Sequence, residues 1–205
     1  SNSEHVERTK SAIKKLEGRL KIVYNECPEL NEPQCAVKLI GLVSTPFIAW
    51  IADDDFLIPN SMEQCVRFLE KHPDYTVALG RSILLYLQSS GPYGKIKGLG
   101  EYGLRPIELD NAIERILNHF SNYTNPNFGV RRTEHARVAY GSLPSLSDLR
   151  FTEILPNCES VIRGKIKQLD CLYLVRQCHD QRYLLPDIFD WITSENWLPS
   201  YKVFC

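Results

Sequence analysis

Apolar positions in the first ninety residues alternate between a helical spacing and a strand-like spacing. Apolar residues three or four positions apart predict helices near 6–16, 36–43 and 61–71. Continuous or alternating apolar runs predict strands at 20–24, 47–52 and 76–87. A helix before each of three strands is the order that builds a parallel sheet with helices outside it.

The rest of the chain has a looser pattern. Five glycines between 91 and 103 predict a surface loop, and a strongly amphipathic helix is predicted over 109–120. Apolar residues share one helical face over 161–173, so we expect the last third to be mainly helical. The patterns predict one domain over residues 1–205. Its fold class is α/β, a mostly parallel sheet flanked by helices with a largely helical C-terminal part.

The composition is that of an ordinary globular chain, and it narrows the function. Its 205 residues are 43% hydrophobic and 24% charged, which is enough to bury one sizeable core. A net charge of −1 gives no reason to expect nucleic acid as a partner. The sequence contains no run of 18 apolar residues, so we expect no transmembrane segment.

The seven cysteines indicate a reducing compartment. Their number is odd and none forms a Cys-x-x-Cys pair, so neither a disulfide framework nor a zinc knuckle is predicted. We expect reduced, mostly buried thiols and a cytoplasmic protein.

Asp53, Asp54 and Asp55 follow the most strand-like run in the chain, 47–52. Three adjacent carboxylates repel one another, so the cluster favours a bound cation. The carboxyl end of a buried strand is the usual ligand edge of an open α/β sheet, and such oxygens suit a hard metal ion there. The alternative is a solvated acidic turn that caps the following helix.

Around this triplet the sequence resembles a known enzyme family. The segment FIAWIADDD at 47–55, followed by FLIPNSMEQCVRFLEKHPD at 56–74, is similar to the family 2 glycosyltransferases with the GT-A fold. In that family a strand ends in a DxD or DDD motif, followed by an apolar pair, a proline and a helix. The resemblance covers most of residues 4–180, and its specific part is 47–74.

Other segments follow the family's order, namely KIVYN at 21–25, FGVRR at 128–132 and SDLRFTEIL at 147–155. The family's first strand–helix–strand unit has no counterpart. Residues 1–90 are therefore expected to form an N-terminally incomplete nucleotide-sugar and metal half, and 104–205 a mainly helical acceptor half. The missing strands would leave a sheet edge open, which favours a homo-oligomer. The processive QxxRW sequence is absent, so no polymerising synthase is expected.

The resemblance implies a metal-dependent glycosyltransferase. It would move a sugar from a nucleotide-sugar donor to a hydroxyl of a carbohydrate or glycan acceptor, with inversion and without processivity. Mn²⁺ or Mg²⁺ would neutralise the leaving diphosphate. The resemblance assigns Asp55 to the metal and Asp53 to the metal or the ribose. Asp54 points to the opposite side of an extended chain, but a shift of one position would exchange these roles.

Asp53, Asp54 and Arg131 are thus predicted to contact the donor, and Asp53, Asp55 and His179 to bind the metal. Some enzymes with this fold take a third metal ligand from a late histidine, which is the reason to name His179. The alternative is a histidine at a helix end that interacts with the last carbonyls. Arg131 and its neighbour Arg132 could face the diphosphate or an anionic acceptor, or form a solvated pair.

An inverting transfer needs a carboxylate that takes the proton of the acceptor hydroxyl. Asp148 and Glu153 are the candidates, and at most one fits because residues five apart do not share a helical face. We prefer Glu153, since apolar neighbours such as Phe151 and Ile154 tune a carboxyl toward base catalysis. The alternative is that both are helix-start carboxylates favoured by the helix dipole.

A second class of function stays open. The missing first unit and the aromatic C-terminus, with Trp191, Trp197 and Tyr201, also fit a non-catalytic carbohydrate-binding or interaction module on a degraded transferase fold. A phosphotransfer domain is a weaker alternative, because the sequence after Asp55 lacks the Thr or Val of a DxDx[TV] loop.

Overall fold

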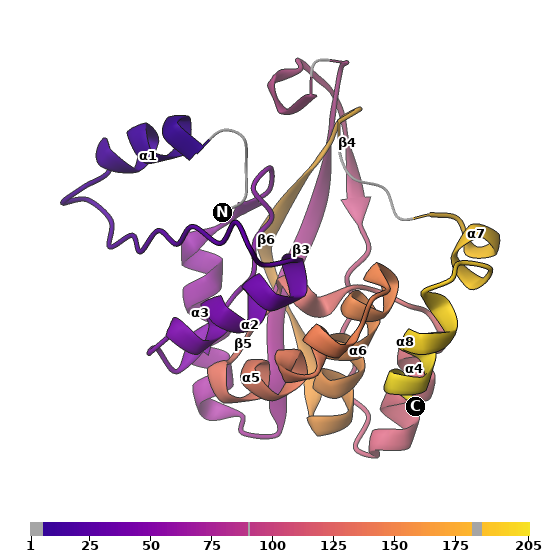
Figure 1. Ribbon diagram of the computed structural model, residues 1–205. Coiled ribbons are helices and arrows are strands. Elements are labelled where there is room, and N and C mark those ends of the chain that lie inside the picture. The colour runs from indigo at the N-terminus through magenta and orange to yellow at the C-terminus, as the bar shows by residue number, and fades with distance from the viewer. Residues whose placement is uncertain (1–5, 90, 182–185) are drawn as a thin grey trace.

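A mixed β-sheet forms the centre of the computed structural model (Figure 1), which describes residues 6–89, 91–181 and 186–205. Five strands follow the order β1-β5-β3-β6-β2, and β4 pairs with β3 outside that path. The strands are β1 (Phe47–Ile48), β2 (Phe56–Leu57), β3 (Tyr75–Leu87), β4 (Ile96–Tyr102), β5 (Val130–Arg132) and β6 (Lys165–Cys178).

The two long strands, β3 and β6, run parallel through the middle of the sheet. The first half of β3 also pairs with β5 and its second half with β4, both antiparallel. At the two ends of the sheet, β1 is antiparallel to β5 and β2 is antiparallel to β6. Of the strand pairs in the described residues, only β3 and β6 are parallel, so the prediction of a mostly parallel sheet is wrong.

Helices cover the sheet and connect its strands. They are α1 (Val6–Lys14), α2 (Glu32–Leu42), α3 (Pro59–Lys71), α4 (Ala112–Ser121), α5 (Thr133–Gly141), α6 (Leu149–Arg163), α7 (Ile188–Ile192) and α8 (Trp197–Phe204), with short 3₁₀ turns η1 (Gly91–Tyr93), η2 (Pro126–Phe128) and η3 (Leu143–Ser145). In Figure 1, α2, α5 and α6 lie in front of the sheet, and α3 packs against β3, β5 and β6. In the part of the chain that the structure describes, no helix combines the length and apolar character needed to cross a bilayer.

Side-chain caps hold the first turns of α2 and α6. Asn31 accepts from the backbone N–H of Gln34 at 3.0 Å, and the Gln34 side chain accepts from the N–H of Asn31 at 3.1 Å, which is a capping box. Asp148 accepts from the N–H groups of Arg150 and Phe151 at 2.9 and 3.1 Å. These bonds satisfy donors that have no partner within the helix, so both helix starts are held in place.

Two apolar clusters stabilise the fold. The larger joins α3, β3, β6 and α6, and Leu69, Val77 and Ile166 are fully buried in it. The smaller joins α2, α5, η3 and the start of α6, and it includes Ile40 and Phe151. The aromatic side chains of α7 and α8 pack against this smaller cluster, which ties the C-terminal helices to the domain.

The prediction of a strand at 20–24 is wrong. The segment carries no strand structure, and Leu20 and Val23 are 60% and 72% exposed. An extended segment becomes a strand only when a neighbouring strand satisfies its backbone N–H and C=O groups. No strand of the described residues pairs with this segment. The next predicted strand, 47–52, forms only at Phe47 and Ile48, where β5 supplies a partner.

The prediction of a helix over 161–173 is also wrong. Helix α6 ends at Arg163, Gly164 follows in an extended conformation, and β6 begins at Lys165. Ile166 and Tyr173 are seven residues apart, which fits one helical face, but both are buried because β6 lies inside the sheet. Pairing with β3 on one side and β2 on the other decides in favour of the strand.

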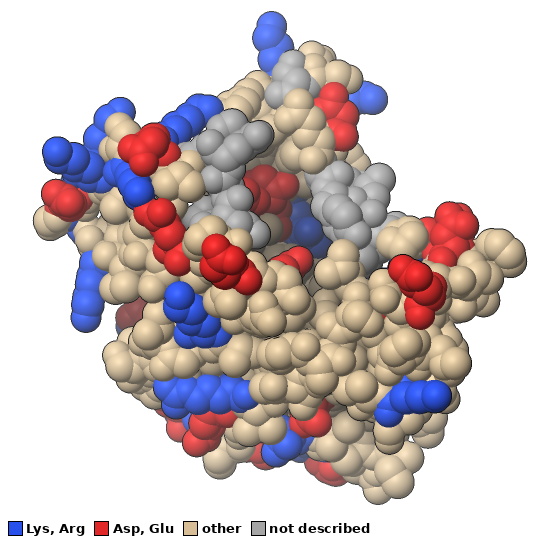
Figure 2. Space-filling view, viewed as in Figure 1, with Lys and Arg blue, Asp and Glu red and all other residues tan. Residues whose placement is uncertain are grey.

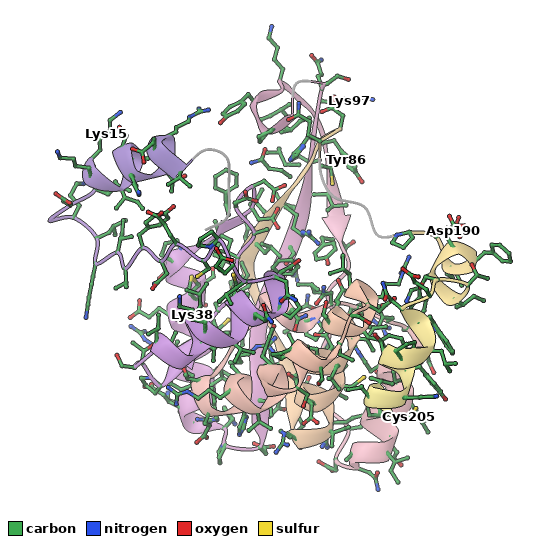
Figure 3. All side chains as sticks on the ribbon, in the orientation of Figure 1. Lys15, Lys38, Tyr86, Lys97, Asp190 and Cys205 are labelled. Atoms are coloured by element: carbon green, nitrogen blue, oxygen red, sulfur yellow. The ribbon has the colours of Figure 1, made fainter. Side chains whose placement is uncertain are left out.

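The glycine-rich stretch at 91–103 contains the strand β4, where a loop was predicted. β4 pairs with the second half of β3 as a ribbon, and Figure 3 shows Tyr86 and Lys97 at its upper end, beyond the helices. A Cβ on Gly100 would lie 2.8 Å from the Tyr86 ring, so the glycine makes room for that ring across the strand pair.

Candidate active site

A cavity of about 820 Å³ lies between the first half of α2, the segment after β1, the turn before β5, the start of α6 and the end of β6. Its polar lining residues include Glu32, Asp53, Asp54, Asn125, Asn127, Thr152, Glu153, Arg176 and Gln177. Figure 2 shows a hollow in this face of the molecule, with acidic and basic side chains visible inside it. Asp53 and Glu153 lie one hundred positions apart in the sequence, and the fold brings both to this cavity.

Asp55 lies behind the cavity wall, where its side chain is 1% exposed. Its Oδ2 accepts from Arg176 Nε at 3.0 Å, and its Oδ1 accepts from the backbone N–H of Gln177 at 3.0 Å. Burial raises the pKa of the Asp55 carboxyl, and the Arg176 charge and the Gln177 N–H counter that rise. Both oxygens of this predicted metal ligand are therefore engaged by β6.

Arg176 carries the positive charge that faces the cavity. Its guanidinium lies 4.5 Å from the ring centre of Phe128 and 4.9 Å from that of Tyr102, and Nη1 donates to Tyr102 Oη at 3.0 Å. Asp55 fixes the remaining side of the group. A guanidinium held by a carboxylate, a hydroxyl and two aromatic faces keeps one orientation, so its charge is preorganised.

Asp54 pairs with His179, the residue directly after β6. Asp54 Oδ2 and His179 Nε2 are 3.0 Å apart, and the histidine side chain is 5% exposed. His179 Nδ1 accepts from the backbone N–H of Gln181 at 3.2 Å, so the proton of the neutral ring lies on Nε2 and is donated to Asp54. The predicted histidine therefore meets the middle aspartate of the triplet, whereas it was expected beside Asp55.

A divalent cation can bridge Asp54 and His179 only when the ring proton moves from Nε2 to Nδ1, which breaks the bond from the Gln181 N–H. An octahedral ion with bonds of about 2.1 Å places adjacent ligands about 3 Å apart, close to the separation of these two atoms. Asp53 is exposed and lines the same cavity. No three histidine, cysteine, aspartate or glutamate side chains gather into a complete protein cage within 6–89, 91–181 and 186–205. A cation here would thus take its other ligands from water or from a substrate.

Glu153 projects from the second turn of α6 and lines this cavity and a second, smaller one of about 220 Å³. Its Oε1 accepts a hydrogen bond from Tyr123 Oη at 2.8 Å. Among the described residues, the two cavities share three lining side chains, those of Asn125, Glu153 and Arg176. The carboxylate therefore lies where two binding spaces meet.

Asp148, the other candidate base, is placed differently. Its side chain caps α6, and both of its oxygens also accept from Trp191 Nε1 at 3.0 Å. It is buried and lines neither cavity. The arrangement gives Asp148 a local task, which is to hold α7 against the start of α6.

Arg131 is 1% exposed and also lies outside both cavities. It donates to the Pro126 carbonyl at 3.0 Å, to Ser160 Oγ at 3.3 Å and to Asn127 Oδ1 at 3.4 Å. Its neighbour Arg132 donates to the carbonyls of Leu69 and His72 at the end of α3. Arg131 holds the turn that brings Asn127 to the cavity. It therefore lies behind the lining residues and is not one of them.

Sequence reasoning assigned no role to Arg176, Gln177 or Tyr123. A strand prediction for 165–178 would have pointed to Arg176 and Gln177 as site residues. The strand β6 runs parallel to β3 and ends beside the aspartate triplet. No local pattern marks Tyr123, which lies in a polar turn after α4. Its contact with Glu153 joins residues thirty positions apart.

The fold resembles that of a known glycosyltransferase. The structure of S. aureus TarS 1-349 superimposes with a TM-score of 0.52 and 15% sequence identity, over 83% of this chain and 48% of that chain. The present chain thus spans about half the length of that structure. No protein-family model and no curated protein sequence matches the chain. At this level of identity the likeness concerns the fold, which is a glycosyltransferase-like α/β fold with a mixed sheet.

Proposed function

We propose that the protein is a metal-dependent glycosyltransferase that moves a sugar from a nucleotide-sugar donor to an acceptor hydroxyl. The observation that carries this proposal is the cavity in which Asp53, Asp54 and Arg176 meet Glu153. A charged donor-binding edge and a carboxylate that can act as a base thus lie in one space. The glycosyltransferase-like fold supports the same conclusion.

The charge of the cavity argues for a cation. Its described lining residues include four carboxylates, Glu32, Asp53, Asp54 and Glu153, and one guanidinium, that of Arg176, whose charge is already paired with Asp55. A diphosphate entering this space would be repelled unless a cation entered with it. Asp54 and His179 would hold that cation, which supplies positive charge to the leaving diphosphate. Mn²⁺ fits better than Mg²⁺, because an imidazole nitrogen suits transition metals.

The chain's own residues then have distinct tasks. Glu153 takes the proton of the acceptor hydroxyl, which approaches from the smaller cavity while the donor occupies the larger one. Arg176, held by Asp55, Tyr102 and Phe128, adds fixed positive charge beside the departing group. A base between donor and acceptor spaces suits a single displacement, which inverts the configuration of the transferred sugar.

Thermal unfolding with nucleoside diphosphates tests the proposal. We expect one of UDP, GDP and dTDP to stabilise the protein only when Mn²⁺ is present, by about 2.7 kcal/mol at a ligand concentration one hundred times its Kd. Asp54→Asn should abolish this stabilisation, because it removes the charged ligand that meets His179.

Asp170→Asn is the matched control, because Asp170 is an 86% exposed carboxylate on β6 that pairs with Arg81 far from the cavity lining. It should leave the stabilisation unchanged. If no nucleoside diphosphate stabilises the wild-type protein with Mn²⁺ or Mg²⁺, the proposed function is wrong.

A second candidate function is sugar binding without catalysis. The larger cavity also has an aromatic wall formed by Trp50, Phe128 and Tyr140, and aromatic faces bind sugars. A binding module would retain oligosaccharides in the presence of EDTA and would release no nucleoside diphosphate from any UDP-, GDP- or dTDP-hexose. A transferase would show the opposite behaviour in both assays.

A further inference from the structure

A hydrogen-bonded chain of uncharged side chains ends on the candidate base. Asn157 Nδ2 donates to Tyr123 Oη at 3.0 Å, and Tyr123 Oη donates to Glu153 Oε1 at 2.8 Å. Asn157 Nδ2 also donates to Asn125 Oδ1 at 3.2 Å. Glu153 and Asn157 are four residues apart on α6, so they share one face of the helix, and the tyrosine hydroxyl bridges them.

The direction of these bonds is set by chemistry. The Asn157 amide nitrogen can only donate, so it occupies a lone pair of the Tyr123 oxygen and leaves the hydroxyl proton for Glu153. Burial, followed by the charge of Glu153, raises the pKa of Tyr123 above its ordinary value. The hydroxyl therefore remains a donor throughout the pH range in which a transferase works.

Two buried side chains, those of His119 and Asn157, lie against the tyrosine. The ring of His119, which is fully buried, lies 5.0 Å from the Tyr123 ring, and Asn157 is fully buried behind the hydroxyl. Among the described residues, no donor bonds to Glu153 Oε2. One carboxylate oxygen is thus occupied and the other is left for a substrate hydroxyl.

We propose that Tyr123 is a positioning residue that orients the Glu153 carboxylate, with Asn157 fixing the direction of the hydrogen bond. The inference rests on the proposed role of Glu153 as the base. The hydrogen bond at Oε1 restricts rotation of the carboxyl group, and Oε2 has no donor among the described residues.

The contact itself is tested without any substrate. A hydroxyl proton bound to a carboxylate resonates downfield in the NMR spectrum, so Tyr123 should give such a resonance at low temperature, where exchange with water slows, and Tyr123→Phe should remove it. Glu153→Gln should shift or abolish it. Glu159→Gln, a change of the same kind on the same helix at a residue paired with Arg163, should leave it in place. A resonance unchanged by Glu153→Gln would overturn the inference.

The functional part is tested on release of nucleoside diphosphate from UDP-, GDP- and dTDP-hexoses. Tyr123→Phe should lower kcat about tenfold with little change in the donor KM, because a misoriented base slows the transfer without changing donor binding. An unchanged kcat, or a loss confined to the donor KM, would refute the inference. Tyr75→Phe, which removes the 2.6 Å bond to Glu108 outside both cavities, should keep full activity.

The two proposals fail in different ways. Retained activity in Glu153→Gln would show that Glu153 is not the base, which refutes the proposed mechanism and the inference together. Lost activity in Glu153→Gln, combined with an unchanged kcat in Tyr123→Phe, would refute the inference alone.

Discussion

Three neighbouring aspartates at the candidate site have three different environments. Asp53 is exposed at the cavity, Asp54 meets His179, and Asp55 is buried against Arg176. Asp53 and Asp54 occupy a turn in which the Asp55 N–H donates to the Ala52 carbonyl at 3.4 Å, so the three side chains leave the backbone in different directions. The repulsion expected of such a triplet is relieved here by a guanidinium on one side and a histidine on another.

His119 gives a prediction on pH and stability at the same scale. Burial lowers its pKa from 6.5 to about 4, and neither ring nitrogen has a hydrogen-bond partner among the described residues. Between pH 6.5 and 4 the unfolded chain binds a proton that the folded protein excludes. The free energy of unfolding should therefore fall as the pH drops through this window, by up to about 3 kcal/mol.

Urea unfolding of His119→Leu at pH 7 and pH 4.5 checks this expectation. The variant should lose less stability between the two values than the wild type, because it has no imidazole to protonate at this site. His72→Gln is the control, since His72 is exposed and its replacement should leave the pH dependence intact. Identical pH dependence in His119→Leu and the wild type would contradict the argument.

At the scale of the element, α4 shows how far an amphipathic pattern can be read. The sequence predicts an amphipathic helix over 109–120, and α4 forms at Ala112–Ser121 with part of its apolar side facing outward while Ile116 packs against the larger apolar cluster. Ile113, Leu117 and Phe120 are 70%, 61% and 50% exposed, whereas Arg115 and His119 are buried. Periodicity establishes that a helix has two faces, and neighbouring elements decide which face is covered.

The buried face of α4 caps another helix. Arg115 Nε donates to the Val161 carbonyl at 2.7 Å and Nη2 to the Ile162 carbonyl at 2.8 Å, both at the end of α6. Nη1 donates to the carbonyls of Leu109 and Asp110. The guanidinium thus satisfies carbonyls that the last turn of α6 leaves open, at the end of the helix where a positive charge is favoured.

Arg115→Met should lower the free energy of unfolding by about 3 kcal/mol, because the buried carbonyls lose their donors. The control is Arg67→Met, which removes a solvent-exposed pair with Glu63 and should cost no more than about 0.5 kcal/mol. Urea unfolding at neutral pH measures both values. Equal effects of the two substitutions would show that Arg115 does not stabilise the α4–α6 junction.

At the scale of the whole molecule, the site is assembled from segments that are far apart in the sequence. Residues after β1, in the turn before β5, on α6 and at the end of β6 meet at one cavity. The sequence predicted two halves, 1–90 and 104–205, but strands of both lie side by side in one sheet, since β3 lies between β5 and β6. The site therefore depends on the β2–β6 pairing, which sets the aspartate triplet just before β2 beside Arg176 near the end of β6.

The segment before α2 contributes least to this assembly. α1 has no buried residue, and the chain around Leu20 and Val23 is exposed. Trypsin should therefore cut after Arg19 or Lys21 first, because local opening there breaks few buried contacts. The shortened protein should keep its Tm within about 2 °C.

Mass spectrometry of the first tryptic products, followed by a thermal scan of the larger one, measures this outcome. A first cut within β6, after Lys165 or Lys167, would show instead that the central strand pair opens before the N-terminal segment does.

The amino-acid sequence by itself determined the elements whose signals are local. Helical spacing located α2, α3 and α4, and a long apolar run located β3. Of the acidic residues that line the cavity, Asp53, Asp54 and Glu153 were predicted from the sequence and Glu32 was not. The direction of the strands, the strand character of β4 and β6, the inward face of α4 and the contacts of Arg176 and Tyr123 were decided only by the tertiary structure. The physical reason is that a helix closes its hydrogen bonds within four residues, whereas a strand and a binding site take theirs from distant parts of the chain.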